Sequence, residues 1–179
     1  MLDREVLQAL KKAGCWQIAM GIESGNQKIL DIIGKGTTLE QVRNAVEETE
    51  KAGIESKGFF MIGHPGETEE TIRDTIKLAT TLPLSVAMFT IVTPLPGSKL
   101  YTQAKEHGLF EEQDWSKYSC WELIFVPKGL TKEMLKSYHR MAYKKFYFRP
   151  RLVLRHLARM RTLHDIKRYT MAARVLMKL

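Results

Sequence analysis

The chain has few cysteines, no long apolar run and no basic leader at its start. Cys15 and Cys120 are its only cysteines, which are too few for a disulfide framework, so a reducing compartment suits them better. No stretch of 18 uninterrupted apolar residues occurs, which argues against a transmembrane helix. The first residues also lack the basic and apolar regions of a signal peptide. We therefore expect a cytoplasmic protein.

Charge is distributed unevenly along the chain. The net charge is +8 over 179 residues, but residues 130–179 carry 14 Lys and Arg against two acidic residues. Residues 1–129 have a net charge of −4. The sequence therefore predicts a mildly acidic body followed by a strongly basic tail.

A repeated pattern in the first part of the chain predicts an α/β fold. Residues 12–14 and 51–53 both read Lys-Ala-Gly, and glycine there is the usual cap at the end of a helix. An apolar run follows each of them, at 15–22 and 54–62, and a third run covers 84–92. Helices that alternate with strands imply right-handed crossovers and a parallel sheet of three main strands.

Capping residues predict where the helices begin and end. Thr38 and Gln41 have the spacing of a capping box, and Thr68 begins the next helix. Ser98 caps a short helix that Gly108 closes. These boundaries, with the strands between them, assign residues 1–110 to one α/β domain.

The rest of the chain divides into two further regions. Residues 111–130 are irregular and rich in aromatic residues, with a short strand expected at 121–126. Residues 131–179 form a basic helical tail, in which Arg149-Pro150 breaks the first helix. In the second helix we expect Val153 to point inward and Arg155 outward, and a third helix begins near residue 165.

Two polar segments follow the first strand. Gly21-Ile22-Glu23-Ser24-Gly25 places a carboxylate and a hydroxyl between glycines, where they could bind an amine or a ribose hydroxyl. The alternative is a turn that begins a helix with Asn26 as its cap. Lys35 lies between two glycines before a helix and could hold a carboxylate or phosphate, or simply lie in a solvated turn. The spacing of a P-loop is absent.

Two further segments follow the second and third strands. Residues 63–68, Gly-His-Pro-Gly-Glu-Thr, form a tight loop at the start of a helix. His64 in that loop is a candidate general acid or base, although a simple polar contact is the commoner role for such a residue. Residues 93–96 form a rigid loop whose backbone could pair with an adenine edge, or a plain corner between strand and helix. All these segments lie at the same end of a parallel sheet, where α/β enzymes build their sites.

The chain resembles the radical S-adenosylmethionine (SAM) superfamily. The segments that carry the resemblance are MGIESGNQKILDIIGKGTT, GFFMIGHPGETEETI and FTIVTPLPGSKLY, and the tail segment GLTKEMLKSYHRMAYKKFYFRPR also matches. They are most similar to the cobalamin-dependent branch, which includes anaerobic porphyrin-ring cyclases and C-methyltransferases. The resemblance covers nearly the whole chain.

This resemblance implies a partial (β/α) barrel whose last three strands are present, followed by C-terminal helices. Glu23 and Ser24 would contact the ribose or methionyl part of SAM, and Lys35 would pair with its carboxylate. The adenine would lie against Ile62, Gly63, Thr93 and Pro94, the last two through their backbone. We expect Glu23, Lys35, Gly63 and Thr93 to surround one nucleoside-sized hollow.

The sequence departs from the family in its cysteines. The family binds a [4Fe-4S] cluster with a C-x₃-C-x₂-C motif, which this chain does not contain. No metal ligand and no catalytic residue is therefore predicted here. The cluster, and any cobalamin, would be held elsewhere in the full-length protein. We expect a C-terminal fragment that binds SAM weakly and catalyses nothing alone.

Two other functions stay open. One is a TIM-barrel-like domain that binds a phosphorylated metabolite through Lys35 and the helix start at Thr68. The other is a module in which the basic tail, including Arg149, binds anionic lipid or RNA, with nucleic acid the less favoured partner. The commoner role of such a tail is a solvated row of cations with its aromatic residues packed over the barrel. A lipid contact would place the protein at the inner face of a membrane. We expect a small-molecule substrate, for which the resemblance suggests a lipid or a tetrapyrrole, and the residues of this chain do not identify it.

Overall fold

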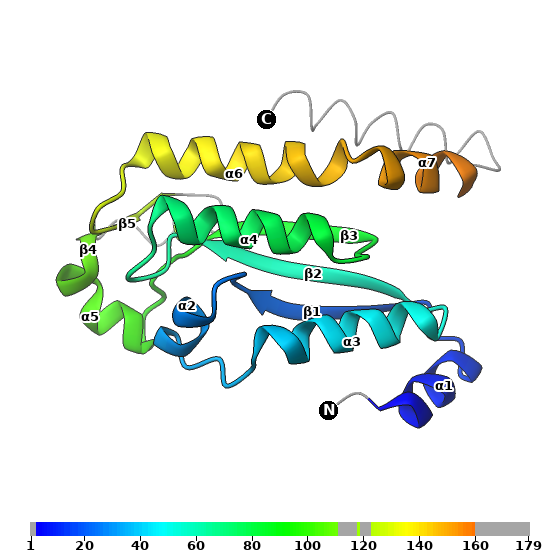
Figure 1. Ribbon diagram of the computed structural model, residues 1–179. Helices are drawn as coiled ribbons and strands as arrows, with labels where there is room; N and C mark the ends of the chain where they lie inside the picture. Colours follow the sequence, from blue (N-terminus) through cyan, green and yellow to red (C-terminus); the bar gives the residue numbers. More distant parts are fainter. Residues whose placement is uncertain (1–2, 111–117, 119–122, 160–179) are drawn as a thin grey trace.

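The computed structural model describes residues 3–110, residue 118 and residues 123–159. Helices and strands alternate through its first part, as predicted (Figure 1). The elements in chain order are α1 (Arg4–Lys12), β1 (Gln17–Glu23), α2 (Gln27–Ile32), α3 (Leu39–Lys51), β2 (Glu55–Ile62), α4 (Glu69–Thr81), β3 (Val86–Ile91), α5 (Lys99–His107), β4 (Gly108–Phe110), β5 (Phe125–Pro127), α6 (Lys132–Tyr147) and α7 (Pro150–Arg159).

The main sheet has three parallel strands in the order β1-β2-β3. This confirms the predicted α/β class, and the arrangement agrees with a partial barrel. Along β2 and β3, buried and half-buried residues alternate, because side chains of a strand point to opposite faces in turn. The buried face lies under α3 and α4, which cross in front of the sheet in Figure 1.

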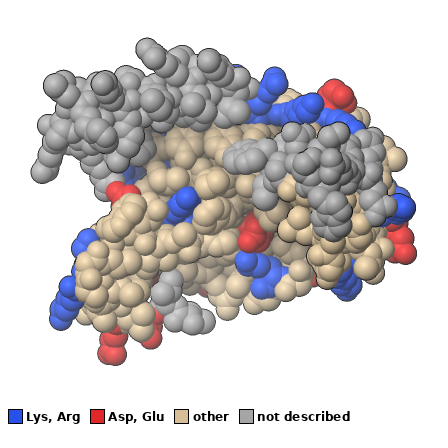
Figure 2. All heavy atoms as spheres, turned by 180° about the vertical axis from the view of Figure 1, so that it is seen from behind, with Lys and Arg blue, Asp and Glu red and all other residues tan. Residues whose placement is uncertain are grey.

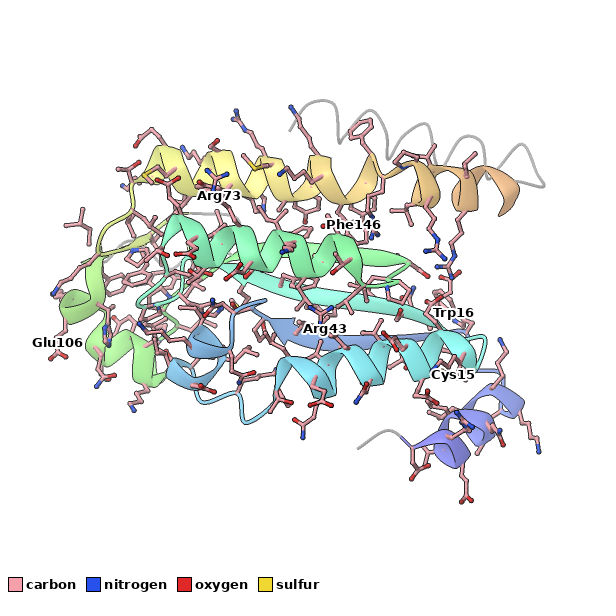
Figure 3. The ribbon with its side chains drawn as sticks, in the orientation of Figure 1. Cys15, Trp16, Arg43, Arg73, Glu106 and Phe146 are labelled. Atoms are coloured by element: carbon pink, nitrogen blue, oxygen red, sulfur yellow. The ribbon has the colours of Figure 1, made fainter. Side chains whose placement is uncertain are left out.

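The core lies between that face of the sheet and the helices. Phe60 of β2 and Phe89 of β3 stack with their ring centroids 5.3 Å apart, and both side chains are fully buried. Phe146 of α6 meets Phe89 edge-on at 6.3 Å (Figure 3). The first helix of the basic tail therefore contributes to the same core as the sheet. None of the described helices combines the length and apolar character needed to cross a bilayer.

Most predicted helix boundaries are confirmed. Thr38 and Gln41 form the capping box of α3, and Thr68 caps α4 together with Thr71. Ser98 accepts a hydrogen bond from the backbone of Tyr101 at the start of α5. The break between α6 and α7 falls at Arg149-Pro150, where proline takes the first helical position of α7.

Helix α6 also closes the outer edge of β3 with side-chain hydrogen bonds. The hydroxyl of Tyr143 accepts from the Phe89 N–H at 3.3 Å and donates to the Phe89 carbonyl at 3.1 Å. His139 Nε2 lies 2.8 Å from the same carbonyl, and Tyr147 donates to the Ala87 carbonyl at 2.9 Å. These side chains take the bonds that a further strand would otherwise make.

Several expectations need correction. The strand expected at 121–126 is present only as β5, which pairs antiparallel with β4, while residues 119–122 lie outside the described residues. Val153 was expected to point inward, but it is 39% exposed because Leu152 takes the buried position beside it. Arg155 does not simply point into solvent, since it pairs with Glu50 at 2.8 Å. The third tail helix lies outside the described residues.

Arg149 is also turned inward rather than solvated. Its guanidinium donates to the carbonyl oxygens of Thr80, Leu82 and Leu84 at 2.7–3.3 Å and lies 4.1 Å from the centre of the Phe146 ring. Arg149 thus fastens the end of α6 to the turn between α4 and β3.

Candidate functional site

The carboxyl ends of the three parallel strands lie along one edge of the sheet. Glu23 at the end of β1 is in register with Phe60, and Ile62 at the end of β2 is in register with Ile91. The N–H of Val92 donates to the Ile62 carbonyl at 2.9 Å, which extends the pairing beyond β3. Adjacent strands are about 4.8 Å apart. The predicted residues of β1, β2 and β3 therefore share this carboxyl edge.

Glu23 and Lys35 form an ion pair at the carboxyl edge. Lys35 Nζ lies 3.1 Å from Glu23 Oε1, and the two side chains are 30% and 20% exposed respectively. Such partly solvated pairs contribute only about 0–1 kcal/mol to stability. The pair is thus a weak structural element, and both groups remain accessible to a ligand.

Gly21 leaves the space in which this pair lies. A Cβ added to Gly21 would lie 2.6 Å from Glu23 Oε1 and 3.1 Å from Lys35 Nζ. Glu23 itself has φ +66°, the left-handed conformation that non-glycine residues rarely adopt, and the register of β1 shifts between Gly21 and Glu23. Strained backbone of this kind is often found at functional sites. The local geometry thus aims the Glu23 carboxylate back over its own strand.

The side chain of Ser24 points to helix α4 rather than to the Glu23–Lys35 pair. Ser24 is fully buried, its hydroxyl lies 3.2 Å from Thr75 Oγ1 of α4, and it accepts from the Asn26 N–H at 3.2 Å. The Gly25 N–H donates to the same Thr75 oxygen at 2.9 Å. Ser24 and Gly25 therefore fasten the turn that carries Glu23 to helix α4. Asn26 stands at the N-cap of α2, but its side chain binds Asp74 instead of capping the helix.

At the end of β2, a ligand could contact backbone groups rather than side chains. The Ile62 side chain is fully buried in the core, and Gly63 has φ +98°. The N–H groups of Gly63 and His64 both donate to Glu67 Oε2, at 2.5 and 3.1 Å. Glu67 therefore fixes the backbone of this loop, a role that sequence reasoning did not assign to it.

Burial changes the titration of this loop. Glu67 is 1% exposed and His64 is 5% exposed. Burial raises the pKa of Glu67 to about 7, although its two backbone hydrogen bonds act in the opposite direction. Burial also lowers the pKa of His64 to about 4. At neutral pH His64 is thus uncharged, and Glu67 is present in both its protonated and its ionised form.

The same loop disfavours a phosphate site at the start of α4. The Glu67 carboxylate already holds the two loop N–H groups, and Thr68 and Thr71 cap each other's backbone at the helix start. A phosphate there would meet a carboxylate and N–H groups that already have partners. The geometry therefore does not favour the phosphometabolite alternative.

Thr93 and Pro94 follow β3 on the same edge. Thr93 is half-buried and its hydroxyl donates to the Ile91 carbonyl at 3.4 Å, while Pro94 is buried. Both stand between the end of β3 and the Ser98 cap of α5. The loop keeps its expected position, and its contribution would come from the backbone.

The chain does not contain the ligands for an iron–sulfur cluster. Cys15 lies before β1, at the end of the sheet opposite the carboxyl edge, with its Sγ 3.5 Å from the Gln17 carbonyl (Figure 3). Cys120 lies outside the described residues. In the part of the chain that the structure describes, no group of three His, Cys, Asp or Glu residues could hold a metal ion. Two cysteines do not match a site that needs three thiolates.

Among the described residues, the second face of the sheet is less covered than the first, although Met61 at its carboxyl end packs against the small cluster of Val92, Ala104 and Phe125. Ala19 and Gly21 are exposed, and Phe59, Met61 and Met88 are half-buried, because α3 and α4 cover only the opposite face. Figure 2 views the molecule from behind the sheet, and many of the described residues in that view are neither acidic nor basic. Phe59, which is in register with Gly21, thus adds an apolar side chain to the face beside the end of β1.

Comparisons with known proteins agree with this arrangement. The model of the family described as the radical SAM superfamily matches residues 1–79. An uncharacterized methyltransferase of Pyrococcus horikoshii is 38% identical over 86% of this chain and 33% of its own length. The anaerobic magnesium-protoporphyrin IX monomethyl ester cyclase of Cereibacter sphaeroides is 31% identical over 84% of this chain and 24% of its own length. The chain thus spans a third or less of these relatives.

Two solved structures share the fold. An Elp3 of Methanocaldococcus infernus has a TM-score of 0.60 and 16% identity, over 79% of this chain and 30% of that protein. The radical SAM methyltransferase TsrM of Kitasatospora setae, solved with cobalamin and a [4Fe-4S] cluster, has a TM-score of 0.53 and 21% identity. That match covers 84% of this chain and 29% of TsrM.

Proposed function

We propose that this chain, which belongs to the radical SAM superfamily, supplies one side of a SAM-binding site at the carboxyl edge of its sheet. The observation that carries the proposal is the Glu23–Lys35 pair. A carboxylate and an ammonium 3.1 Å apart match the ammonium and carboxylate of an α-amino acid, which is the group at the methionyl end of SAM. Lys35 would bind the carboxylate, and Glu23 the amine or a ribose hydroxyl.

The ends of β2 and β3 would hold the adenine side of SAM. Gly63, with φ +98° and no side chain, allows close approach to its backbone, and Ile62 precedes it in the strand. Thr93 and Pro94 would line the other side through their backbone. Ser24, for which the resemblance implied direct contact with SAM, would act by fixing the turn of Glu23 to α4.

In the whole protein SAM would supply radical chemistry or a methyl group. Both a cyclase and methyltransferases are among the relatives, and a TsrM structure contains a [4Fe-4S] cluster and cobalamin. The residues of this chain do not fit the cluster, so its ligands, and any cobalamin site, would lie outside this chain. The substrate would be a small molecule. A tetrapyrrole is favoured by the names of the magnesium-protoporphyrin cyclase and of a further relative, the bacteriochlorophyllide d C-8(2)-methyltransferase of Chlorobaculum tepidum. Alone, the chain would bind SAM weakly and be inactive.

Equilibrium dialysis against SAM tests this proposal. We expect Lys35→Met to weaken SAM binding by about 10- to 100-fold, because a charge-assisted hydrogen bond is lost. Lys28→Met, which removes an exposed lysine of α2, should leave binding unchanged. 5′-Methylthioadenosine, which lacks the amino-acid group, should bind both variants equally. An equal loss of SAM affinity in Lys35→Met and Lys28→Met would contradict the proposal. So would the absence of any SAM binding by the unchanged chain.

A further inference from the structure

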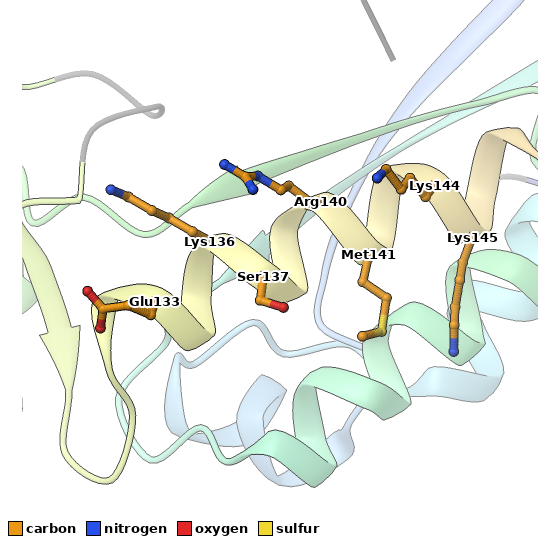
Figure 4. Close-up of a pocket in the computed structure, with 7 residues that line it drawn as sticks. All are labelled: Glu133, Lys136, Ser137, Arg140, Met141, Lys144 and Lys145. Carbon is orange, nitrogen blue, oxygen red and sulfur yellow. The ribbon is translucent and has the colours of Figure 1, made fainter. Parts of the chain in front are cut away.

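The outer face of α6 carries a cationic stripe, which consists of Lys136, Arg140, Lys144 and Lys145. All four side chains are exposed. The first three follow one another at intervals of four residues, so they lie along one side of the helix about 6 Å apart. Figure 4 shows Lys136, Arg140 and Lys144 extended on the same side of α6. The buried residues of α6 face the sheet, on the opposite side of the helix.

No ion pair within the described residues neutralises the cationic stripe. The four cations share a shallow surface hollow of about 500 Å³ with Glu133, Ser137 and Met141, and Glu133 is the single acidic residue of α6 (Figure 4). Other cations of the tail are used internally, since Arg149 binds backbone carbonyls and Arg155 pairs with Glu50. The stripe thus presents concentrated positive charge to an external partner.

Exposed apolar side chains follow the stripe. Phe148 stands four residues after Lys144 and is 56% exposed. Val153 and Leu154 of α7 are 39% and 65% exposed. Helices α6 and α7, which carry the cations and two of these apolar residues, lie nearly end to end along the top of Figure 1. Leu152 of α7 is buried and Leu154 is exposed, so Leu154 lies on the side of α7 away from the core.

We propose that this layer, the cationic stripe with Phe148, Val153 and Leu154, binds the surface of a membrane that contains anionic lipid. Anionic headgroups would neutralise the cations, and the apolar side chains would enter the boundary between headgroups and acyl chains. A soluble polyanion would satisfy the cations but leave the apolar groups in water. The combination therefore favours a lipid surface, against which α6 and α7 lie flat.

Vesicle co-sedimentation of the full chain tests the electrostatic part. The chain should bind vesicles of phosphatidylcholine and phosphatidylserine, with affinity that falls as salt rises, and should bind phosphatidylcholine vesicles poorly. The triple variant Lys136→Glu, Arg140→Glu, Lys144→Glu should lose on the order of 100-fold in partition coefficient. The matched control, Arg43→Glu, Lys77→Glu, Lys105→Glu, makes the same charge change on exposed residues of α3, α4 and α5 and should bind as the unchanged chain does.

The apolar part has a separate variant. Phe148→Ser with Leu154→Ser should remove the binding that persists at high salt, while the salt-dependent part remains. Equal loss in the two triple variants would overturn the proposal, since it would show attraction by net charge alone. Binding to single-stranded RNA that depends on the stripe, without binding to anionic vesicles, would overturn it as well. Thermal midpoints of all variants ensure that folded proteins are compared.

Discussion

At the scale of single residues, the loop after β2 contains two buried ionisable side chains with opposite shifts. Glu67 holds its proton up to about pH 7 in the folded protein, whereas His64 stays neutral down to about pH 4. In an unfolded chain Glu titrates near 4.5 and His near 6.5. Between these two values the folded pair is neutral, whereas the unfolded pair consists of a carboxylate and an imidazolium.

Between pH 4.5 and 6.5, this pair should affect the pH dependence of stability only when one partner is removed. The contribution of Glu67 is fully present below pH 4.5 and is lost as pH rises through 7. The contribution of His64 is fully present above pH 6.5 and is lost as pH falls through 4. Each amounts to about 3 kcal/mol in the free energy of unfolding, so the two offset each other between 4.5 and 6.5.

Urea unfolding over this pH range measures the effect. Relative to the unchanged chain, Glu67→Gln should become more stable as pH rises, because only His64 still titrates. His64→Gln should become less stable as pH rises, because only Glu67 remains. If the free energy of unfolding changed with pH in the same direction in both variants, the assigned pKa shifts of Glu67 and His64 would be contradicted.

At the scale of elements, the two edges of the sheet are unequal. β3 is closed by His139, Tyr143 and Tyr147 of α6. Among the described residues β1 pairs with β2 alone, and its exposed residues include Ala19 and Gly21. The sheet could thus be extended beside β1 but not beside β3.

Tyr143→Phe tests the closure of β3. The change leaves the buried N–H of Phe89 without a partner, while the Phe89 carbonyl keeps His139. An unsatisfied buried donor costs about 1–3 kcal/mol in the free energy of unfolding. Hydrogen exchange at the Phe89 amide should accelerate accordingly. Ser137→Ala, on the exposed side of the same helix, should change neither quantity, and equal effects of the two changes would contradict the assigned role.

At the scale of the whole molecule, a β1 that pairs only with β2 among the described residues predicts self-association. Unpaired strand edges readily pair with other chains, and a charge on the strand prevents this. The isolated chain should form larger species as its concentration rises, and Ala19→Lys should suppress them. Ala13→Lys adds the same charge at the end of α1, outside the sheet, and should not. Light scattering after size exclusion checks this; a chain that is monomeric at every concentration would refute it.

The sequence predicted the local features of the fold better than its long-range contacts. The three strands of the main sheet, the Thr38 and Ser98 caps and the break at Pro150 depend on neighbouring residues, and they are confirmed. The inward turn of Arg149 depends on carbonyls some 65 residues earlier in the chain, which no local pattern reveals. Its place in a run of cations instead suggested a solvated side chain.

The location of the candidate site could be predicted from the sequence, but the directions of some of its side chains could not. Parallel strands place Glu23, Gly63 and Thr93 on one edge, so their common location followed from the order of elements. Two side-chain directions did not follow. Glu67 turns back to the N–H groups of Gly63 and His64 in its own loop. Ser24 turns to Thr75, because helix α4 packs against the turn after β1. Gly25 marks that packing, since a Cβ there would lie 2.5 Å from the Asp74 carbonyl.

The closure of β3 also has a consequence in time. Phe89 leaves the ribosome 54 residues before Tyr143, its partner in α6. At a synthesis rate of about 5–20 residues per second, the outer margin of β3 stays bare for roughly 3–11 seconds in every nascent chain. During that interval the edge of β3 in the nascent chain can pair wrongly with other nascent chains on the same polysome. The synthesis and packing of α6 end this exposure.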